Sequence, residues 1–354
     1  MAWLSGWNKR IKFTVDYTKI DAALSYFPVT VFLTPTHGDC IFDELTADAN
    51  RLKIAFTKAD GTTELYGEIE KWDDGNESAI IHISRDGWEI ASDADTDFYM
   101  YFDVDHADNT TYIGDIDSTP AQSVWDSSYE AVYHMNDGAS TSAIYDSTSN
   151  NNDGTKKGAG EPAEATGQVG QAQDFDGSDD YIEITGVTDA GTTHTIEAVI
   201  YSHDSTSAGK YFLDIQTGRL LFGWGSDNAG KIGVYDGTWR DFGDSPSVNE
   251  WHHVAFVLNG SNSKMLMYLD GALYGSELTY TPHAIGGDIA IGARHTFITY
   301  NFDGIIDETH ISSSLRTAAW LKATYYSLFD GLLTYGSEEE APSGANSLFF
   351  GFNF

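Results

Sequence analysis

Two stretches of the chain join a glycine turn to carboxylates and then to a strand-like run, an arrangement that could hold a cation. In DFDGSDDYIEI, residues 174–184, the carboxylates after the glycine are Asp179 and Asp180. In FDGIIDETHI, residues 302–311, the corresponding carboxylate is Asp307. Calcium takes six to eight oxygen ligands, commonly from carboxylates and turn carbonyls. If the two turns lie on neighbouring strands, we predict a structural calcium site with Asp179 and Asp307 as side-chain ligands and Asp180 as the substitute. The alternative is that these acids only cap their turns by accepting backbone N–H bonds.

A second candidate site consists of aromatic residues that could stack on a sugar. Trp224, Tyr235 and Trp239 fall on consecutive predicted strands or on their turns. Flat aromatic faces stack well on sugar rings, and their polar edges can hydrogen-bond. We therefore take these three residues as candidate glycan contacts. Packing in a hydrophobic core is the alternative role for each of them.

Composition limits the classes of partner. The chain of 354 residues carries 54 acidic and 19 basic side chains, which gives a formal charge of −35. Such a surface repels phosphate backbones and anionic membranes, so we expect no nucleic-acid binding, and it suits cation binding. The single cysteine, Cys40, excludes an internal disulfide framework. The amino terminus, MAWLSGWNKRIKF, has no apolar run long enough for a signal peptide or a membrane span, so we expect no membrane insertion, and a mature form with its signal removed would look the same.

Strand and turn signals predict an all-β protein of two antiparallel β-sandwich domains. Short alternating runs bounded by glycine, aspartate and asparagine recur along the whole chain. We expect one domain over residues 1–118, a second over residues 124–335, and a C-terminal tail over residues 336–354. The one convincing helix is TAAWLKATYYS, residues 317–327, whose apolar face can lie against a sheet.

Segments in a fixed order carry a family resemblance. Between residues 124 and 335 these are DSTSNNNDGT, GQAQDFDGSDDYIEI, HTIEAVIY, WHHVAFVL, MLMYLDGALYG and FDGIIDETHIS. The set resembles the laminin-G-like, concanavalin-A-like jelly-roll domains of the lectin/glucanase superfamily. The first 118 residues, with WNKRIKFTVD, FPVTVFL, LKIAFTKADGTTELYGEIEKWD and DTDFYMYF, resemble an uncharacterised domain often found directly in front of such jelly rolls. The pairing implies a surface protein, as on phage or virus particles, that is often associated with glycan binding. Jelly rolls of this type often carry one structural calcium, which supports the predicted site.

The sequence does not carry the patterns of known catalytic sites. Jelly-roll glucanases use ExDxE or ExDxxE on one strand, and neither occurs on a strand here, nor do HExxH, GxSxG, a P-loop or GxGxxG after a strand. Glu68 and Glu70 share one face of a predicted strand, but the resemblance of that region implies no reaction. His252 and His253 are adjacent on one strand and so point to opposite faces, which is poor geometry for joint ligation. We predict that the protein is not an enzyme.

The chain ends in aromatic residues that follow a polar stretch. Exposed aromatic side chains are unfavourable in water, so we expect them to dock on a partner or on a second copy of the chain. Docking on this chain and a vestigial outer-membrane signature are the alternatives, and the acidic charge argues against the second. The residues concerned are Leu348, Phe349, Phe350, Phe352 and Phe354.

These observations favour a non-enzymatic structural and binding protein of a virion surface, such as a capsid decoration or tail-fibre component. Its expected partners are other virion proteins, further copies of itself, and host glycans. One alternative is a secreted bacterial or archaeal adhesin or carbohydrate-binding protein, located outside the cell or on its surface. A glycoside hydrolase is a third hypothesis, opposed by the missing carboxylate pattern.

Overall fold

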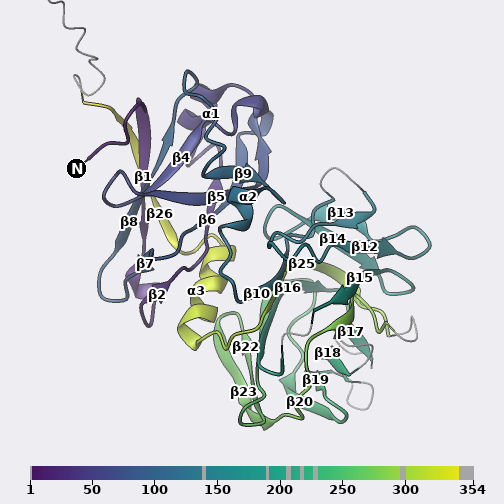
Figure 1. The fold of residues 1–354 in the computed structure, drawn as a ribbon. Helices are drawn as coiled ribbons and strands as arrows, with labels where there is room; N and C mark the ends of the chain where they lie inside the picture. The colour runs from purple at the N-terminus through teal and green to yellow at the C-terminus, as the bar shows by residue number, and fades with distance from the viewer. Residues whose placement is uncertain are drawn as a thin grey trace, which may run out of the picture. The chain divides into compact units, whose positions relative to one another are not determined.

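The computed structural model folds the chain into two units built mainly of antiparallel strands (Figure 1). The structure describes residues 2–137, 141–188, 191–204, 209–215, 219–225, 230–295 and 300–342. Unit 1 consists of residues 1–124 together with the chain from residue 330 onward, and unit 2 consists of residues 125–329. The predicted all-β class is confirmed.

Unit 1 contains a mixed sheet in the order β26-β1-β8-β4-β5-β6-β3, in which β9 pairs parallel with β5. Strand β1 shows why these segments form a sheet, because Ile11, Phe13 and Val15 alternate along it and are buried. A separate ribbon joins β2 and β7. The strands are β1 (Lys9–Val15), β2 (Leu24–Ser25), β3 (Val29–Leu33), β4 (Ile54–Lys58), β5 (Glu64–Asp73), β6 (Ser78–Ser84), β7 (Glu89–Ile90), β8 (Thr96–Phe102), β9 (Ile113–Asp115) and β26 (Leu333–Glu340). The helices are α1 (Asp39–Leu45) and α2 (Thr119–Gln122), with 3-10 turns at Tyr17–Lys19, Asp48–Asn50 and Asp74–Asn76.

Strand β26 follows unit 2 in the sequence, yet it pairs into the sheet of unit 1. It pairs antiparallel with β1, with Val15 opposite Leu333. Arg10 strengthens this pairing through an ion pair of 2.7 Å with Glu339. The observed boundaries therefore differ from the predicted ones, which placed the end of the second domain at residue 335. The backbone groups of the β1 edge need hydrogen-bond partners, and β26 supplies them.

Unit 2 is a sandwich of two antiparallel sheets, which confirms the predicted jelly roll. The β25 sheet has the order β13-β14-β25-β16-β21-β22-β23, with β10 also paired to β25, and the β17 sheet has the order β11-β12-β15-β24-β17-β18-β19-β20. The strands are β10 (Tyr129–Tyr133), β11 (Ala143–Ile144), β12 (Gly154–Lys157), β13 (Ala163–Thr166), β14 (Gln171–Asp176), β15 (Tyr181–Val187), β16 (His194–Ser202), β17 (Lys210–Ile215), β18 (Leu220–Trp224), β19 (Lys231–Tyr235), β20 (Trp239–Asp244), β21 (Trp251–Asn259), β22 (Lys264–Leu269), β23 (Ala272–Thr279), β24 (Gly287–Ile291) and β25 (Asp303–Ser312).

The two sheets bury one hydrophobic core between them. Phe256 of the β25 sheet packs against Phe212 and Phe222 of the β17 sheet, with ring centroids 6.2 and 5.2 Å away. Helix α3 (Ala318–Leu328) packs beside β23, as Figure 1 shows. Thr317 caps this helix, since its side-chain oxygen accepts from the backbone N–H of Trp320. The predicted helix is thus confirmed within one residue at each end.

Candidate functional site

The loop between β14 and β15 gathers three carboxylates at one point of unit 2. One oxygen of each of Asp176, Asp179 and Asp180 lies within 4.8 Å of the other two. Oxygens that bind one Ca²⁺ at about 2.5 Å can be at most about 5 Å apart, so this spacing fits a single calcium ion. The turn is tight because Gly177 has a φ of +72°, and Ser178 N–H donates to Asp176 Oδ1 at 2.8 Å.

The electrostatics of this loop favour a cation. Asp180 is 6 % exposed, and its Oδ2 accepts a bond of 3.1 Å from the N–H of Asp176. Burial raises the pKa of Asp180, and the negative charges of Asp176 and Asp179 raise it further. A bound cation would offset both effects, because it favours the ionised carboxylate. The structure therefore brings together Asp179 and Asp180 of the predicted calcium set, and it adds Asp176.

Asp307, the other predicted calcium ligand, is not part of this group of carboxylates. It is fully buried in β25, where its Oδ2 accepts from Val169 N–H and its Oδ1 from Glu308 N–H, both at 2.9 Å. Asp307 therefore accepts backbone N–H bonds, which is the alternative role that we gave these acids from the sequence. The sequence could not place it, because the pairing of β25 with β14 puts Asp303, not Asp307, opposite Asp176.

Trp224, a candidate glycan contact, lies in the core of unit 2. Its side chain is fully buried, and it packs against Phe212 and Phe302 with ring centroids 6.4 and 5.7 Å away. A sugar cannot reach this indole, so Trp224 has the packing role that was the alternative. The reason is strand alternation, which puts Trp224 on the same core-facing side as Phe222.

The other two candidates, Tyr235 and Trp239, lie opposite one another on β19 and β20 and are both partly exposed. Directly paired residues project from the same face of a sheet. Their neighbour Val234 is fully buried in the core. Tyr235 and Trp239 therefore stand on the face of the β17 sheet that points away from the core.

Trp239 belongs to a row of three rings, the aromatic shelf, which consists of Trp239, Tyr211 and Tyr300. The ring of Tyr211 lies in the middle, with centroids 6.3 Å from Trp239 and 5.7 Å from Tyr300. Tyr300 is 42 % exposed. The outer two rings each approach a glycine closely, because a side chain at Gly225 would collide with Trp239 and one at Gly209 would collide with Tyr300. Sequence reasoning missed Tyr211 and Tyr300, which carry no local motif.

Asn301 connects the aromatic shelf to the carboxylate loop. Its backbone forms a parallel bridge with Tyr211, and its side-chain amide donates to the carbonyl of Ser178. Asn301 is 2 % exposed, and its Oδ1 has no hydrogen-bond partner among the residues that the structure describes. Lys210 also reaches the loop, since its Nζ donates to the carbonyl of Gly177 at 3.5 Å. Asn301 and Lys210 thus both donate hydrogen bonds to backbone carbonyls of the carboxylate loop.

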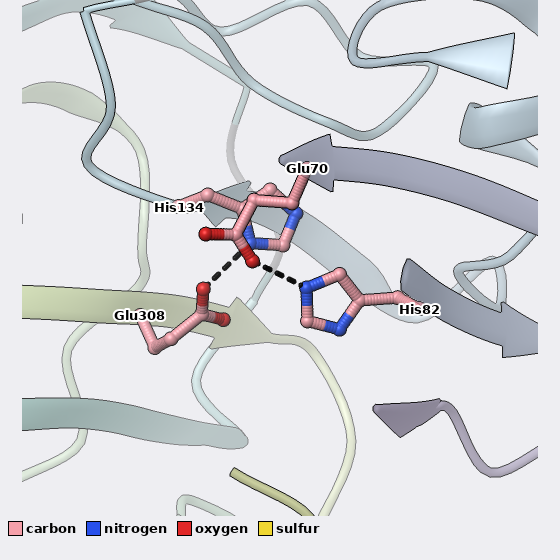
Figure 2. A group of neighbouring side chains, drawn as sticks. All are labelled: Glu70, His82, His134 and Glu308. Carbon is pink, nitrogen blue, oxygen red and sulfur yellow. Dashed lines mark hydrogen bonds and ion pairs between the residues drawn. The ribbon is translucent and has the colours of Figure 1, made fainter. Parts of the chain in front are cut away.

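Two histidine–glutamate pairs, one within each unit, are drawn in Figure 2. In unit 1, His82 Nε2 and Glu70 Oε2 are 2.8 Å apart. In unit 2, His134 Nδ1 and Glu308 Oε1 are 2.7 Å apart. Each pair hydrogen-bonds a carboxylate to an imidazole, which orients both side chains.

The β25 sheet carries further buried acid–histidine pairs. Glu308 Oε2 also lies 2.9 Å from His310 Nε2, and Glu197 Oε2 lies 3.1 Å from His253 Nε2. Burial by itself favours neutral Glu197, but the hydrogen bond from His253 and nearby positive charges outweigh it and lower the pKa of Glu197. The adjacent His252 bonds instead to Asp270 at 2.9 Å, so the two histidines do diverge as predicted.

Two further features concern partners. The predicted docking residues Leu348, Phe349, Phe350, Phe352 and Phe354 lie outside the described residues. Among the residues that the structure describes, no helix is both long enough and apolar enough to span a membrane.

Comparisons with known proteins agree with the fold of unit 2. A family model described as the concanavalin A-like lectin/glucanases superfamily matches residues 176–322. No curated protein matches the chain in sequence.

Similar solved structures are distant. Domain 4 of AbnA, a GH43 extracellular arabinanase from Geobacillus stearothermophilus, in complex with arabinotriose, is 20 % identical with a TM-score of 0.41 and aligns over 55 % of this chain and 96 % of its own. The ligand-binding domain of botulinum neurotoxin serotype D, in complex with N-acetylneuraminic acid, is 15 % identical with a TM-score of 0.42. The alignment covers 56 % of this chain and 50 % of the neurotoxin chain. The binding domain of Paraclostridial Mosquitocidal Protein 1 is 10 % identical with a TM-score of 0.44. The alignment covers 57 % of this chain and 53 % of the mosquitocidal chain. The chain thus spans about half the length of the two toxin domains.

Proposed function

We propose that this chain is a non-enzymatic glycan-binding protein, and that unit 2 holds the glycan on the aromatic shelf. The observation that carries the proposal is the row formed by Trp239, Tyr211 and Tyr300. Aromatic rings normally bury their faces in a core, yet Tyr300 is 42 % exposed and Trp239 is partly exposed. Each of these two rings packs against a glycine that leaves room for it. The exposed parts of the Trp239 and Tyr300 rings can stack on the apolar faces of sugar rings, and the buried Tyr211 ring, 4 % exposed, packs between them.

The carboxylates of the β25 sheet support a binding role rather than hydrolysis. A glycoside hydrolase needs two carboxyl groups that flank the glycosidic bond, one of them with a raised pKa as general acid. Glu197 and Glu308 are 1 % exposed and are bonded to histidines. The lowered pKa of Glu197 is the opposite of what a general acid requires.

We also propose a structural calcium at the carboxylate loop, with Asp176, Asp179 and Asp180 as side-chain ligands. Three carboxylates within 4.8 Å supply the charge, and turn carbonyls of the same loop supply further oxygens. A metal that binds only the folded state stabilises it by about 2.7 kcal/mol at a hundredfold excess over the dissociation constant.

The wider role that we propose is at a virion surface, together with other particle proteins and further copies of this chain. The resemblance of the first 118 residues to domains in front of such jelly rolls supports this placement. The formal charge of −35 supports solubility in an assembly that binds neither nucleic acid nor anionic membrane. Copurification with particles, followed by size-exclusion chromatography of the isolated chain, tests this role.

A glycan array probed with the full chain tests the glycan-binding function. Arabinotriose and N-acetylneuraminic acid should be included, since solved structures of similar fold contain them. Trp239→Ala and Tyr300→Ala should each abolish the signal, while the melting temperature stays within a few degrees. Tyr17→Ala is the matched control, because Tyr17 is also 42 % exposed but lies in unit 1. An array without any signal for the wild-type protein, or equal signals for all variants, would contradict the proposal.

A further inference from the structure

The exposed rings of the aromatic shelf limit the size of the ligand that fits it. Tyr211 is 4 % exposed, so a ligand reaches mainly the rings of Trp239 and Tyr300. These two rings lie 6.3 and 5.7 Å from Tyr211, centroid to centroid, and make no ring contact with one another in the part of the chain that the structure describes. Rings in contact have centroids within about 7 Å, so Trp239 and Tyr300 are roughly 7 to 12 Å apart.

This separation is too large for a single sugar. A sugar ring is about as wide as a tyrosine ring, so one sugar unit can stack on Trp239 or on Tyr300 but not on both. A ligand that uses both rings is therefore a chain of sugar units, and each stacked unit adds a contact of its own. Affinity should then rise with the length of the chain until both rings are covered.

A carboxylate stands at one end of the shelf. Asp241 is exposed and follows Trp239 by two residues on β20, so both side chains project from the same face of the sheet. The cross-strand row that contains Tyr211 continues through Gly223 and Gly233 to Asp241. The two glycines add no side chains to this row, so Asp241 is the next side chain along it after Tyr211.

The basic side chains near the shelf are already engaged or lie away from it. Residues 210–244 contain four basic side chains, and the structure describes all of them. Arg219 adjoins the turn at the far end of β17 from Tyr211. The bonds of the other three are Arg240 Nε to Asp236 Oδ2 at 3.0 Å, Lys231 Nζ to Asp244 Oδ1, and Lys210 Nζ to the carbonyl of Gly177 at 3.5 Å. An acidic group on the shelf would thus meet Asp241 without a free cation of this segment to offset the repulsion.

We propose that the aromatic shelf binds an extended, uncharged oligosaccharide and disfavours acidic glycans, with one sugar unit on Trp239, another on Tyr300, and Asp241 as the residue that repels a negative charge. This inference rests on the proposed glycan-binding function and narrows it to a class of glycan. Trp239 and Tyr300 determine the length of the ligand, and Asp241 determines its charge.

The first arm of the test measures how affinity depends on length. Arabino-, xylo- and cello-oligosaccharides of one to five units are titrated into the full chain by calorimetry. In the series that binds best, the longest member should bind at least about tenfold more tightly than the single sugar. Trp239→Ala and Tyr300→Ala should each remove this gain, and Tyr17→Ala, in unit 1, should keep it. Equal affinity for the single sugar and the longest member would overturn the proposal while glycan binding stands.

The second arm measures the effect of charge. The oligosaccharide that binds best is compared with a derivative that carries one uronic acid. The acidic derivative should bind at least about threefold more weakly at 10 mM salt, and the difference should shrink in 1 M salt, where the Debye length is about 3 Å. Equal binding of the two at 10 mM salt would overturn the proposal.

A charge variant with a matched control shows whether the repulsion is local. Asp241→Lys should remove or reverse the preference for the neutral glycan. Asp105→Lys changes the formal charge by the same amount at an exposed position of unit 1, so it should leave the preference unchanged. If both variants behave alike, Asp241 has no special role. If acidic glycans bind and neutral ones do not, the inference fails and the glycan-binding function stands, whereas binding of neither class contradicts the function itself.

Discussion

Asp126→Asn should strongly destabilise unit 2, because it breaks a buried ion pair. Arg316 meets Asp126 in two parallel bonds, Nη1 to Oδ2 at 2.6 Å and Nη2 to Oδ1 at 3.0 Å. The side chains of Arg316 and Asp126 are 7 % and 17 % exposed. The guanidinium also lies between two rings, 4.4 Å from Tyr129 and 4.1 Å from Trp320. This pair therefore ties the start of helix α3 to strand β10.

The expected magnitude follows from the charge that the substitution leaves behind. Removing one partner of a buried ion pair typically costs about 3–5 kcal/mol, because the other charge stays buried without compensation. For a unit of this size, each kcal/mol lowers the melting temperature by roughly 2–4 °C. We therefore expect a decrease of roughly 6–20 °C, measured by differential scanning calorimetry. Asp244→Asn is the control, because its pair with Lys231 is on the surface and Asp244 is 83 % exposed.

The pH dependence gives a second check of the same reasoning. Burial favours the neutral acid, but the hydrogen bonds and charge of Arg316 outweigh it and lower the pKa of Asp126. A carboxylate with a lowered pKa stabilises the fold above its unfolded pKa of about 3.9, and this stabilisation is lost as the pH falls through the folded pKa. The difference between wild type and Asp126→Asn should thus be constant from about pH 6 to 8 and shrink below about pH 4. A decrease in melting temperature of under about 2 °C at pH 7 would refute the argument.

Further predictions concern the loop, the shelf and the strand order. If the calcium concentration is about a hundredfold above the dissociation constant, EDTA should lower the melting temperature of unit 2 by roughly 5–11 °C, and Asp180→Asn should remove most of that sensitivity. An unchanged melting temperature in EDTA, together with no calcium by elemental analysis, would contradict the site. Gly209→Ala should displace the ring of Tyr300 and weaken glycan binding about tenfold or more. Gly186→Ala, at the same φ of +72° but with no atom of the described residues within 4 Å of the added Cβ, should leave binding unchanged. A chain truncated after Pro342 should keep both units folded and lose self-association in size-exclusion chromatography, and elution identical to that of the full-length chain contradicts the partner-docking hypothesis. In a chain truncated before β26, unit 1 should unfold at a lower temperature, because β1 loses its paired strand.

The sequence predicted the features that depend on neighbours along the chain. Alternation gave most strands, and the apolar face of residues 317–327 gave the one long helix, because both follow from local side-chain direction. Asp179 and Asp180 were predicted to share a site because they are adjacent in the sequence, directly after a glycine turn. The divergence of His252 and His253 followed from strand geometry alone.

Sequence could not choose which face of a strand lies in the core. Trp224 and Trp239 are both aromatic and both lie at strand ends, yet one is fully buried and the other partly exposed. Alternation fixes only that neighbours point to opposite faces. Which face meets the other sheet depends on Phe212 and Phe256, which belong to strands far apart in the sequence.

The amino-acid sequence alone therefore predicted the strands, the acidic charge and the carboxylate turn, since these follow from composition and from contacts between residues a few positions apart. Only the tertiary structure decided that Asn301 and Tyr300 lie beside Tyr211, that Asp307 bonds to the backbone of Val169, and that β26 pairs with β1. Those pairings depend on which strand edges satisfy their backbone hydrogen bonds while burying apolar side chains. That condition is met by the whole fold at once, and no local pattern records it.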